Sequence, residues 1–185
     1  GGRRVEPHFI RRIVDRHGRT VWEASPRSQQ VLDPARAFVL TSMLRDVVDR
    51  GTGTAVRAAG FRGAAAGKTG TTNDAADVWF VGYTPELVGA VWLGMDRPAT
   101  ILAGAAGGQL GAPVWGRTMA RVYQDREPAA DWVMPEGVRR LRTDPNSGLA
   151  VTSGCWVSRT TDEVFLATNL PPSGCPERPR RGFFD

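Results

Sequence analysis

The chain has 185 residues, of which 41% are hydrophobic and 23% are charged, so it can form a domain with a buried core and is not intrinsically disordered. The formal net charge is +5, but the arginines are scattered and no basic run is flanked by stacking aromatic residues, which argues against a nucleic-acid partner. No apolar run approaches the roughly 18 residues that a membrane span needs.

The N-terminal region predicts a β-hairpin. Two β-rich runs, 8–14 and 20–23, flank the turn sequence Asp-Arg-His-Gly at 15–18. The two histidines, His8 and His17, stand beside a turn or a strand end, without Cys or carboxylate clusters at metal-ligand spacing. We therefore expect both to be surface residues and we expect no metal site.

The clearest helical pattern follows. Asp33 is a favourable N-cap, and Pro34 suits the first helical position, where its missing N–H costs nothing. One face repeats at three- and four-residue steps through Ala37, Phe38, Thr41, Leu44, Val47 and Val48. Gly51 is expected to end the helix as a C′ glycine and to begin a flexible loop at 51–54.

Three strands are predicted next, at 64–71, 77–83 and 87–95, and a short turn at 84–86 makes the last two a hairpin. In the middle strand Trp79 and Tyr83 share one face and Val78, Phe80 and Gly82 share the other, so both faces are expected to pack. We interpret Phe80 and Trp92 as core residues and Trp79 as a candidate groove-wall residue.

The glycine-rich segment 104–111 lacks the G-x-G-x-x-G spacing of a dinucleotide site and is interpreted as a flexible connection. A helix is predicted from about Pro113 to Asp125, with Trp115, Met119 and Val122 toward the sheet. Beyond Pro128 turn residues become frequent, with a strong turn at 144–148 and a last strand at 163–166. These features predict two regions, 1–127 and a β-rich extension at 128–185, of which 171–185 is expected to be disordered.

Lys68 is the only lysine among 24 cationic side chains; all the others are arginine. Arginine is a permanently charged planar fork, whereas lysine is a compact ammonium that can share a proton. Three threonines follow it, at positions 69, 71 and 72. A lone lysine between glycines, followed by hydroxyl groups, predicts a functional site.

The ordered motifs from Arg50 to Gly94 resemble the penicillin-binding transpeptidases, and most closely the class A bifunctional synthases that also carry a glycosyltransferase. They are Arg50-Gly51-Thr52-Gly53, Lys68-Thr69-Gly70-Thr71-Thr72, Asp77, Trp79-Phe80, Gly82-Tyr83-Thr84-Pro85 and Val91-Trp92-Leu93-Gly94. A K-T-G triplet alone is weak evidence for this family, whereas the whole ordered series of motifs is specific to it. The resemblance extends from Gly1 to about Leu166. It implies an α+β fold in which helices pack on an antiparallel sheet of about five strands, with a small β-rich tail.

The resemblance also implies a role for each residue of the motif in acyl transfer. Lys68 would direct positive charge toward the substrate carboxylate and help relay protons. The hydroxyl groups of Thr69 and Thr71 would bind that carboxylate, and the backbone N–H of Thr71 would be one oxyanion donor. Gly70 would let substrate lie along the strand edge. The further substrate-binding residues implied are Thr72 and Trp79, and no cofactor or metal is expected.

Two family motifs are absent from these 185 residues. An S-x-x-K motif cannot occur, because Ala65 stands three residues before the only lysine, and no serine begins an S-x-N triad. In the family both motifs precede the lysine strand, and Gly1 aligns just after them. We therefore expect the C-terminal half of a transpeptidase domain, cut from a longer product. Alone, it should neither turn over peptide nor be acylated by penicillin.

The expected partners are peptidoglycan stem peptides, β-lactams and the N-terminal half of the same domain. Contact with the membrane is expected only through an N-terminal anchor outside this chain, on the outer face of the bacterial cytoplasmic membrane. Since the resemblance places the chain outside the cytoplasm, a disulfide between Cys155 and Cys175 is predicted, with two free cysteines as the alternative.

Other functions are weighed against this one. A P-loop is disfavoured because the glycine that it requires before Gly67-Lys68-Thr69 would stand at position 62, which is Arg62. A serine β-lactamase shares the fold and the K-T-G strand, but the tail and the Trp79–Trp92 run favour the synthase. A non-catalytic wall-binding fragment stays open.

Overall fold

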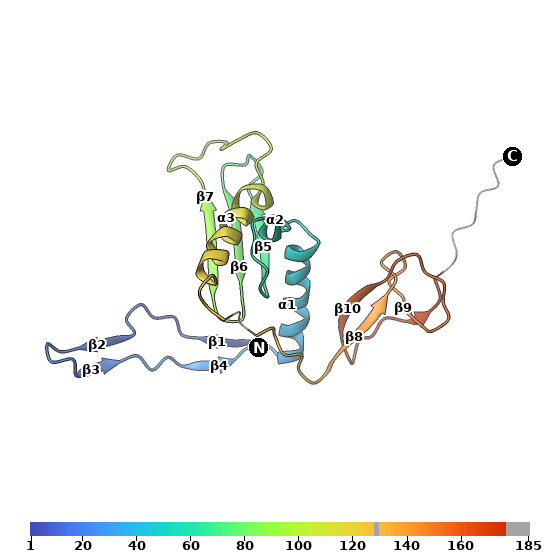
Figure 1. The fold of residues 1–185 in the computed structure, drawn as a ribbon, viewed down its shortest axis with the longest axis horizontal. Helices are drawn as coiled ribbons and strands as arrows, with labels where there is room; N and C mark the ends of the chain where they lie inside the picture. The colour runs from blue at the N-terminus through green and yellow to red at the C-terminus, as the bar shows by residue number, and fades with distance from the viewer. Residues whose placement is uncertain (128–129, 177–185) are drawn as a thin grey trace.

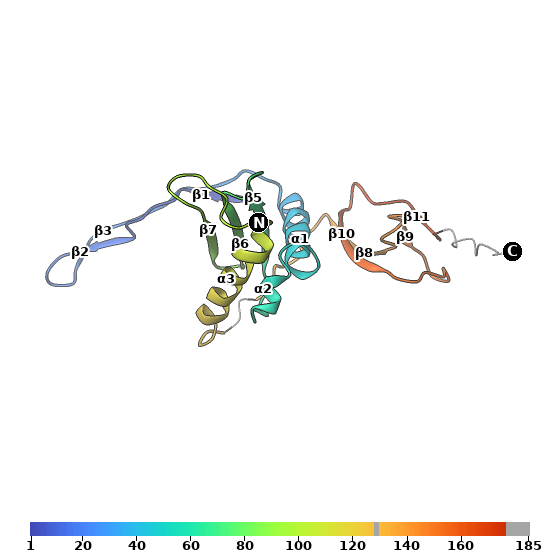
Figure 2. The ribbon, with the colours of Figure 1, turned by 90° about the horizontal axis from the view of Figure 1, so that it is seen from above.

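The computed structural model describes residues 1–127 and 130–176. A central body of helices and strands lies between a long N-terminal arm and a C-terminal β-module, which project in opposite directions (Figures 1 and 2). The mixed α/β architecture with antiparallel sheets matches the predicted fold class.

The arm consists of two short antiparallel ribbons in series. β1 (Arg3–Val5) pairs with β4 (Ser28–Gln30), and β2 (Arg12–Val14) pairs with β3 (Thr20–Glu23). The predicted hairpin is confirmed, although its first strand begins at Arg12 rather than at residue 8. The β1–β4 pair, which lies next to the body (Figure 1), was not predicted, because its polar sequences carry no alternating apolar pattern. Both histidines are exposed, as expected.

Helix α1 (Pro34–Asp49) confirms the predicted helix, and the Asp33 carboxylate accepts a hydrogen bond from the Arg36 N–H. The role of Gly51 differs from the prediction, because its φ is not in the left-handed region. A Cβ at this position would instead lie 2.9 Å from Val47 Cα, so the returning chain needs a residue without a side chain. A short helix, α2 (Ala55–Ala58), follows and was not predicted.

Replacing Asp33 by alanine is expected to lower the free energy of unfolding by about 1 kcal/mol, because the first turn of α1 loses its capping acceptor. Urea denaturation of the chain at neutral pH measures the loss. Asp33→Asn keeps an acceptor oxygen and is the matched control. Equal destabilisation by the two variants would show that the cap contributes nothing.

The central sheet is an antiparallel meander of β5 (Ala66–Thr71), β6 (Val78–Tyr83) and β7 (Val88–Leu93), in that order. The three predicted strands are confirmed. The sheet has three strands within the described ranges rather than about five, because the strands of the arm pair only with one another. Trp92 is not a core residue as predicted: it pairs with Trp79 across β6 and β7, and both indoles are exposed.

Helix α3 (Gly107–Val122) begins six residues before the predicted Pro113, inside the segment interpreted as a flexible connection. Trp115 and Met119 are buried against the sheet as predicted, whereas Val122 is half-buried and Tyr123 packs against the core instead. The early start has a packing reason, because the glycines bring this helix into close contact with β5 and β6.

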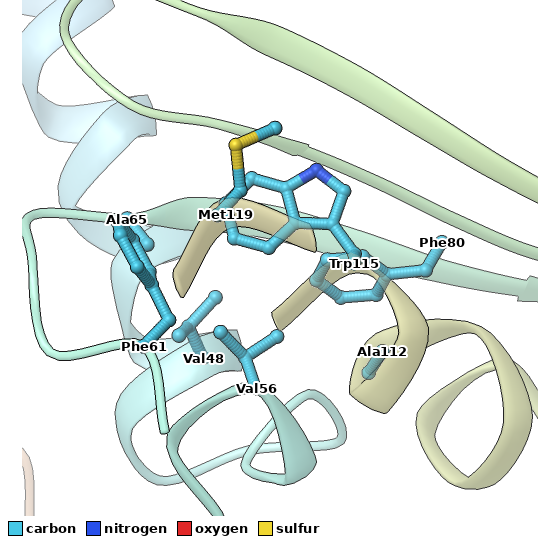
Figure 3. Packing of buried hydrophobic residues seen from close by; sticks show 8 residues of the cluster. All are labelled: Val48, Val56, Phe61, Ala65, Phe80, Ala112, Trp115 and Met119. Carbon is cyan, nitrogen blue, oxygen red and sulfur yellow. The ribbon is translucent and has the colours of Figure 1, made fainter. Parts of the chain in front are cut away.

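The core of the body lies between α3 and one face of the sheet (Figure 3). Phe80 and Trp115 are almost completely buried, with ring centroids 5.7 Å apart, and Trp115 Nε1 donates a hydrogen bond to Gly89 O. The cluster also contains Val48, Val56, Phe61, Ala65, Ala112 and Met119. The other face of β6 is less covered than predicted, because Trp79 is 42% exposed.

The C-terminal module is a sheet of order β10-β8-β9-β11. Its strands are β8 (Val138–Thr143), β9 (Ala150–Val151), β10 (Thr161–Leu166) and β11 (Ser173–Gly174). The predicted turn at 144–148 and the strand at 163–166 are confirmed. Residues 173–174 pair with β9, and 177–185 lie outside the described residues. The expected disorder of 171–185 stays a prediction. The division at 127/128 stays a prediction.

The module contacts α1 through a second apolar cluster, in which Val138 is buried with Ala35 and Phe38. Arg50, just past the end of α1, forms ion pairs with Asp46 and with Glu163 of β10. These contacts connect the module to the helix that leads into the Lys68 strand.

In the structure Cys155 is bonded to Cys175, across a sequence separation of 20. We expect no free thiol when the protein is denatured without reductant, and titration with a thiol reagent measures this. Joint replacement of the two cysteines by serine should destabilise the module by about 3 kcal/mol on the chain-entropy model. Two free thiols in the unreduced protein would contradict the prediction.

Candidate functional site

Lys68 lies on β5, which is an edge strand of the central sheet. One edge of β5 pairs with β6, in a register that places Lys68 opposite Val81 and Gly70 opposite Trp79. At its other edge, β5 pairs with no strand of the described chain. An edge strand presents backbone N–H and C=O groups to an extended peptide, so β5 can accept one by strand addition.

The Lys68 ammonium is exposed, and Nζ donates a hydrogen bond of 2.6 Å to the carbonyl oxygen of Thr69. Within the described residues it forms no ion pair with a carboxylate. The single lysine of the chain therefore retains donor capacity for an anionic ligand at the edge of β5.

Thr69 and Thr71 point to the opposite face of β5 from Lys68, as alternate residues of a strand do. Thr69 Oγ1 lies 3.0 Å from Thr52 Oγ1, so the 51–54 loop contacts the lysine strand. Thr71 Oγ1 accepts a 3.1 Å hydrogen bond from the N–H of Gly107. Because that oxygen acts as the acceptor, the Thr71 hydroxyl hydrogen stays free to donate to a ligand.

The N-terminus of α3 packs against the lysine strand. A Cβ at Gly107 would lie 2.3 Å from Trp79 O, and a Cβ at Gly108 would lie 2.0 Å from Thr52 O. Only glycine permits this approach, which directs the positive end of a 16-residue helix toward Thr71. Sequence reasoning missed both glycines as site residues. The sequence feature that could have revealed them is the position of the Gly107-Gly108 pair, directly before a segment whose apolar residues, including Trp115, recur at helical spacing.

Gly108→Val is expected to destabilise the chain by about 2 kcal/mol or more, because the added side chain overlaps the Thr52 carbonyl. Thermal unfolding measures the change. Gly70→Ala is the control, because a Cβ there would lie 3.3 Å from Trp79 Cβ and needs only a small adjustment. Similar melting temperatures for Gly108→Val and the wild type would contradict this packing.

Trp79 lies beside Gly70 on the Lys68 face of the sheet and is tilted against Trp92, with ring centroids 6.1 Å apart. Trp92 Nε1 donates to Asp77 Oδ1 at 2.9 Å, which orients the pair. The two indoles form an exposed apolar wall next to Lys68. The position of Trp79 fits its predicted place in a groove wall, and its role in substrate binding stays a prediction.

Thr72 lies at the end of β5, where its hydroxyl oxygen accepts hydrogen bonds from the N–H groups of Ala76 and Asp77. These contacts stabilise the turn between β5 and β6. The side chain is thus engaged in local structure, and its assignment to substrate binding stays a prediction.

Across the described ranges, His, Cys, Asp and Glu side chains form no group of three that could hold a metal ion. In the same part of the chain, no helix has the length and apolar character needed to cross a membrane. The chemical groups that β5 presents are a lysine ammonium, threonine hydroxyls and backbone N–H and C=O groups.

Comparisons with known proteins agree with the motif. The model of the penicillin binding protein transpeptidase domain matches residues 1–120. Penicillin-binding protein 1A of Pseudomonas aeruginosa is 38% identical over 154 residues, which cover 83% of this chain and 18% of that protein. Penicillin-binding protein 1A of Rickettsia typhi is 31% identical over 193 residues, covering 92% and 24% respectively. The chain thus spans about a fifth of the length of these relatives.

A solved crystal structure has a similar fold. The crystal structure of penicillin-binding protein 1A from Haemophilus influenzae superimposes with a TM-score of 0.81 and covers 96% of this chain and 31% of that one. At 22% identity this likeness shows the fold alone. Because the family model covers most of the residues and includes the Lys68 strand, the chain belongs to the penicillin-binding protein transpeptidase domain family.

Proposed function

We propose that β5 is the substrate-anchoring strand of a serine D,D-transpeptidase, which cross-links peptidoglycan stem peptides and is acylated by β-lactams. The observation that carries this proposal is an edge strand with three features that favour anions: the exposed Lys68 ammonium on one face, and the Thr69 and Thr71 hydroxyls and the N-terminus of α3 on the other. Each of them favours an anionic group, and both substrates carry a carboxylate.

In this proposal the chain supplies binding and electrostatic stabilisation. The substrate backbone extends along the free edge of β5 beside Gly70, and its carboxylate accepts hydrogen bonds from the two threonine hydroxyls. The acyl carbonyl then lies next to the backbone N–H of Thr71, which serves as an oxyanion donor. Lys68 adds positive charge and takes part in proton relay.

The nucleophile has to come from elsewhere, because these 185 residues hold neither S-x-x-K nor S-x-N. Attack by a serine hydroxyl on the acyl carbon would form an acyl-enzyme and expel the terminal D-alanine, and an amine would then accept the acyl group. We place this reaction on the outer face of the bacterial cytoplasmic membrane, where the polymer is assembled. Acylation by penicillin follows the same first step, with opening of the β-lactam ring.

The test uses the longest encoded polypeptide that contains residues 1–185. Replacing Thr69 and Thr71 together by valine keeps their shape and removes both hydroxyls, so the second-order rate of penicillin acylation should fall about 10- to 100-fold. Thr118→Val is the control, because its hydroxyl donates to Val114 O on an exposed part of α3. An unchanged acylation rate in the double variant would refute the carboxylate-binding role.

A further inference from the structure

A cleft of about 670 Å³ lies in the C-terminal module, away from the Lys68 strand. Its size is typical of small-molecule sites. The turn that follows β8 and the loop that carries Trp156 form its walls, and Cys175 of the disulfide lines it as well. The transpeptidase chemistry proposed above makes no use of this cleft.

The polar groups of the cleft suit a neutral ligand. Among the described residues, those that line the cleft include no lysine or arginine, so an anionic ligand would find no counter-charge in this part of the chain. Asp144 is a lining residue, and its carboxylate accepts hydrogen bonds from the hydroxyl and the N–H of Ser147. These bonds lower the pKa of Asp144, so its carboxylate is ionised at neutral pH. Asn146 and Ser158 add an amide and a hydroxyl, which can both donate and accept.

Trp156 supplies a large apolar surface to the same cleft and is 57% exposed. The four tryptophans of the body and of the segment that follows it, at positions 79, 92, 115 and 132, each pack against another aromatic ring. An indole face beside hydrogen-bonding groups of both kinds matches a pyranose ring, which has an apolar C–H face and a polar rim.

We propose that this cleft binds an N-acetylated glycan strand, with a sugar ring stacked on Trp156 and its acetamido and hydroxyl groups hydrogen-bonded to Asn146 and Ser158. The choice of an N-acetylated glycan rests on the proposed function, since the peptidoglycan backbone is a polymer of N-acetylated sugars. Binding would hold the glycan strand on the same polypeptide that carries the proposed cross-linking site.

The disulfide joins the Trp156 loop to the segment that contains β11, and both line the cleft. Cys155 directly precedes Trp156, and its partner Cys175 lines the cleft. Reduction would release the Trp156 loop from the segment that contains β11. Glycan binding should therefore require the oxidised pair, whereas the body, which has its own core, stays folded.

The test is calorimetric titration of the chain with the β-1,4-linked hexamer of N-acetylglucosamine. We expect saturable binding that weakens about tenfold in Trp156→Ala and less than threefold in Trp156→Phe, which keeps an aromatic face. Trp22→Ala removes a comparably exposed indole from the arm and is the control. Joint replacement of Cys155 and Cys175 by serine should abolish binding, and circular dichroism of each variant checks that it remains folded.

Three results would overturn the proposal: no binding by the wild-type chain, wild-type affinity in Trp156→Ala, or equal affinity for the glucose hexamer that lacks acetamido groups. The saccharide carries no peptide, so its binding is independent of Lys68. Penicillin acylation of the longest polypeptide without glycan binding would therefore overturn this inference alone. Glycan binding without penicillin acylation of the longest polypeptide would overturn the transpeptidase proposal alone.

Discussion

In the longest polypeptide that contains residues 1–185, Lys68→Ala is expected to lower the second-order rate of penicillin acylation by about 10²- to 10³-fold. This is the loss that removing one electrostatic donor typically causes in acyl-transfer enzymes. Lys68 forms no ion pair within the described residues, so its removal leaves no buried carboxylate unpaired and should affect stability little. Stopped-flow kinetics with a chromogenic penicillin or cephalosporin measures the rate.

Two further variants separate charge from proton transfer. Lys68→Arg keeps a positive charge but replaces the compact ammonium with a planar guanidinium group, which does not readily give up a proton. This variant should therefore retain only part of the wild-type acylation rate. Arg62→Ala removes another exposed cation, six positions earlier in the chain, and should leave the rate unchanged. Acylation of Lys68→Ala at the wild-type rate would show that the lysine has no part in the reaction.

Trp115→Ala is expected to lower the free energy of unfolding by about 3–5 kcal/mol, which is enough to unfold much of the population of a marginally stable domain. Trp115 is 1% exposed, contacts the rings of Phe61 and Phe80, and donates a hydrogen bond from Nε1 to Gly89 O. Truncation would leave a cavity between α3 and the sheet and an unpaired carbonyl on β7.

Urea denaturation of the 185-residue chain, followed by circular dichroism, measures this loss. Trp22→Ala on the exposed arm is the matched control and should change the free energy of unfolding by less than about 0.5 kcal/mol. A loss below about 1 kcal/mol for Trp115→Ala would mean that α3 does not hold the sheet as the structure shows.

The sequence was most informative where the local pattern and the packing agree. Asp33-Pro34 marks the start of α1 by cap chemistry alone, and the two strands that follow the Lys68 strand are rich in β-forming residues. The site motif could be read because the only lysine of the chain stands in it. These features depend on near neighbours in the chain, which is what a sequence pattern reports.

The sequence-based predictions that were wrong concern contacts between residues that are far apart in the chain. From the sequence, Gly107 was interpreted as part of a flexible connection. In the structure β5 and β6 lie against it, and any side chain at this position would meet the Trp79 carbonyl. Trp92 was predicted to be a core residue, but its pairing with Trp79 places it on the exposed face of the sheet. The β1–β4 ribbon joins polar segments from the two ends of the arm, and no local apolar pattern indicates such a pairing.

The transpeptidase proposal is tested most directly by labelling with a fluorescent penicillin, carried out in parallel on the 185-residue chain and on the longest polypeptide that contains it. We expect one label per molecule of the longest polypeptide and none on the isolated chain, because the isolated chain holds the anchoring strand without a nucleophile motif. Stoichiometric labelling of the isolated chain would contradict it, since the reacting serine would then lie within these residues.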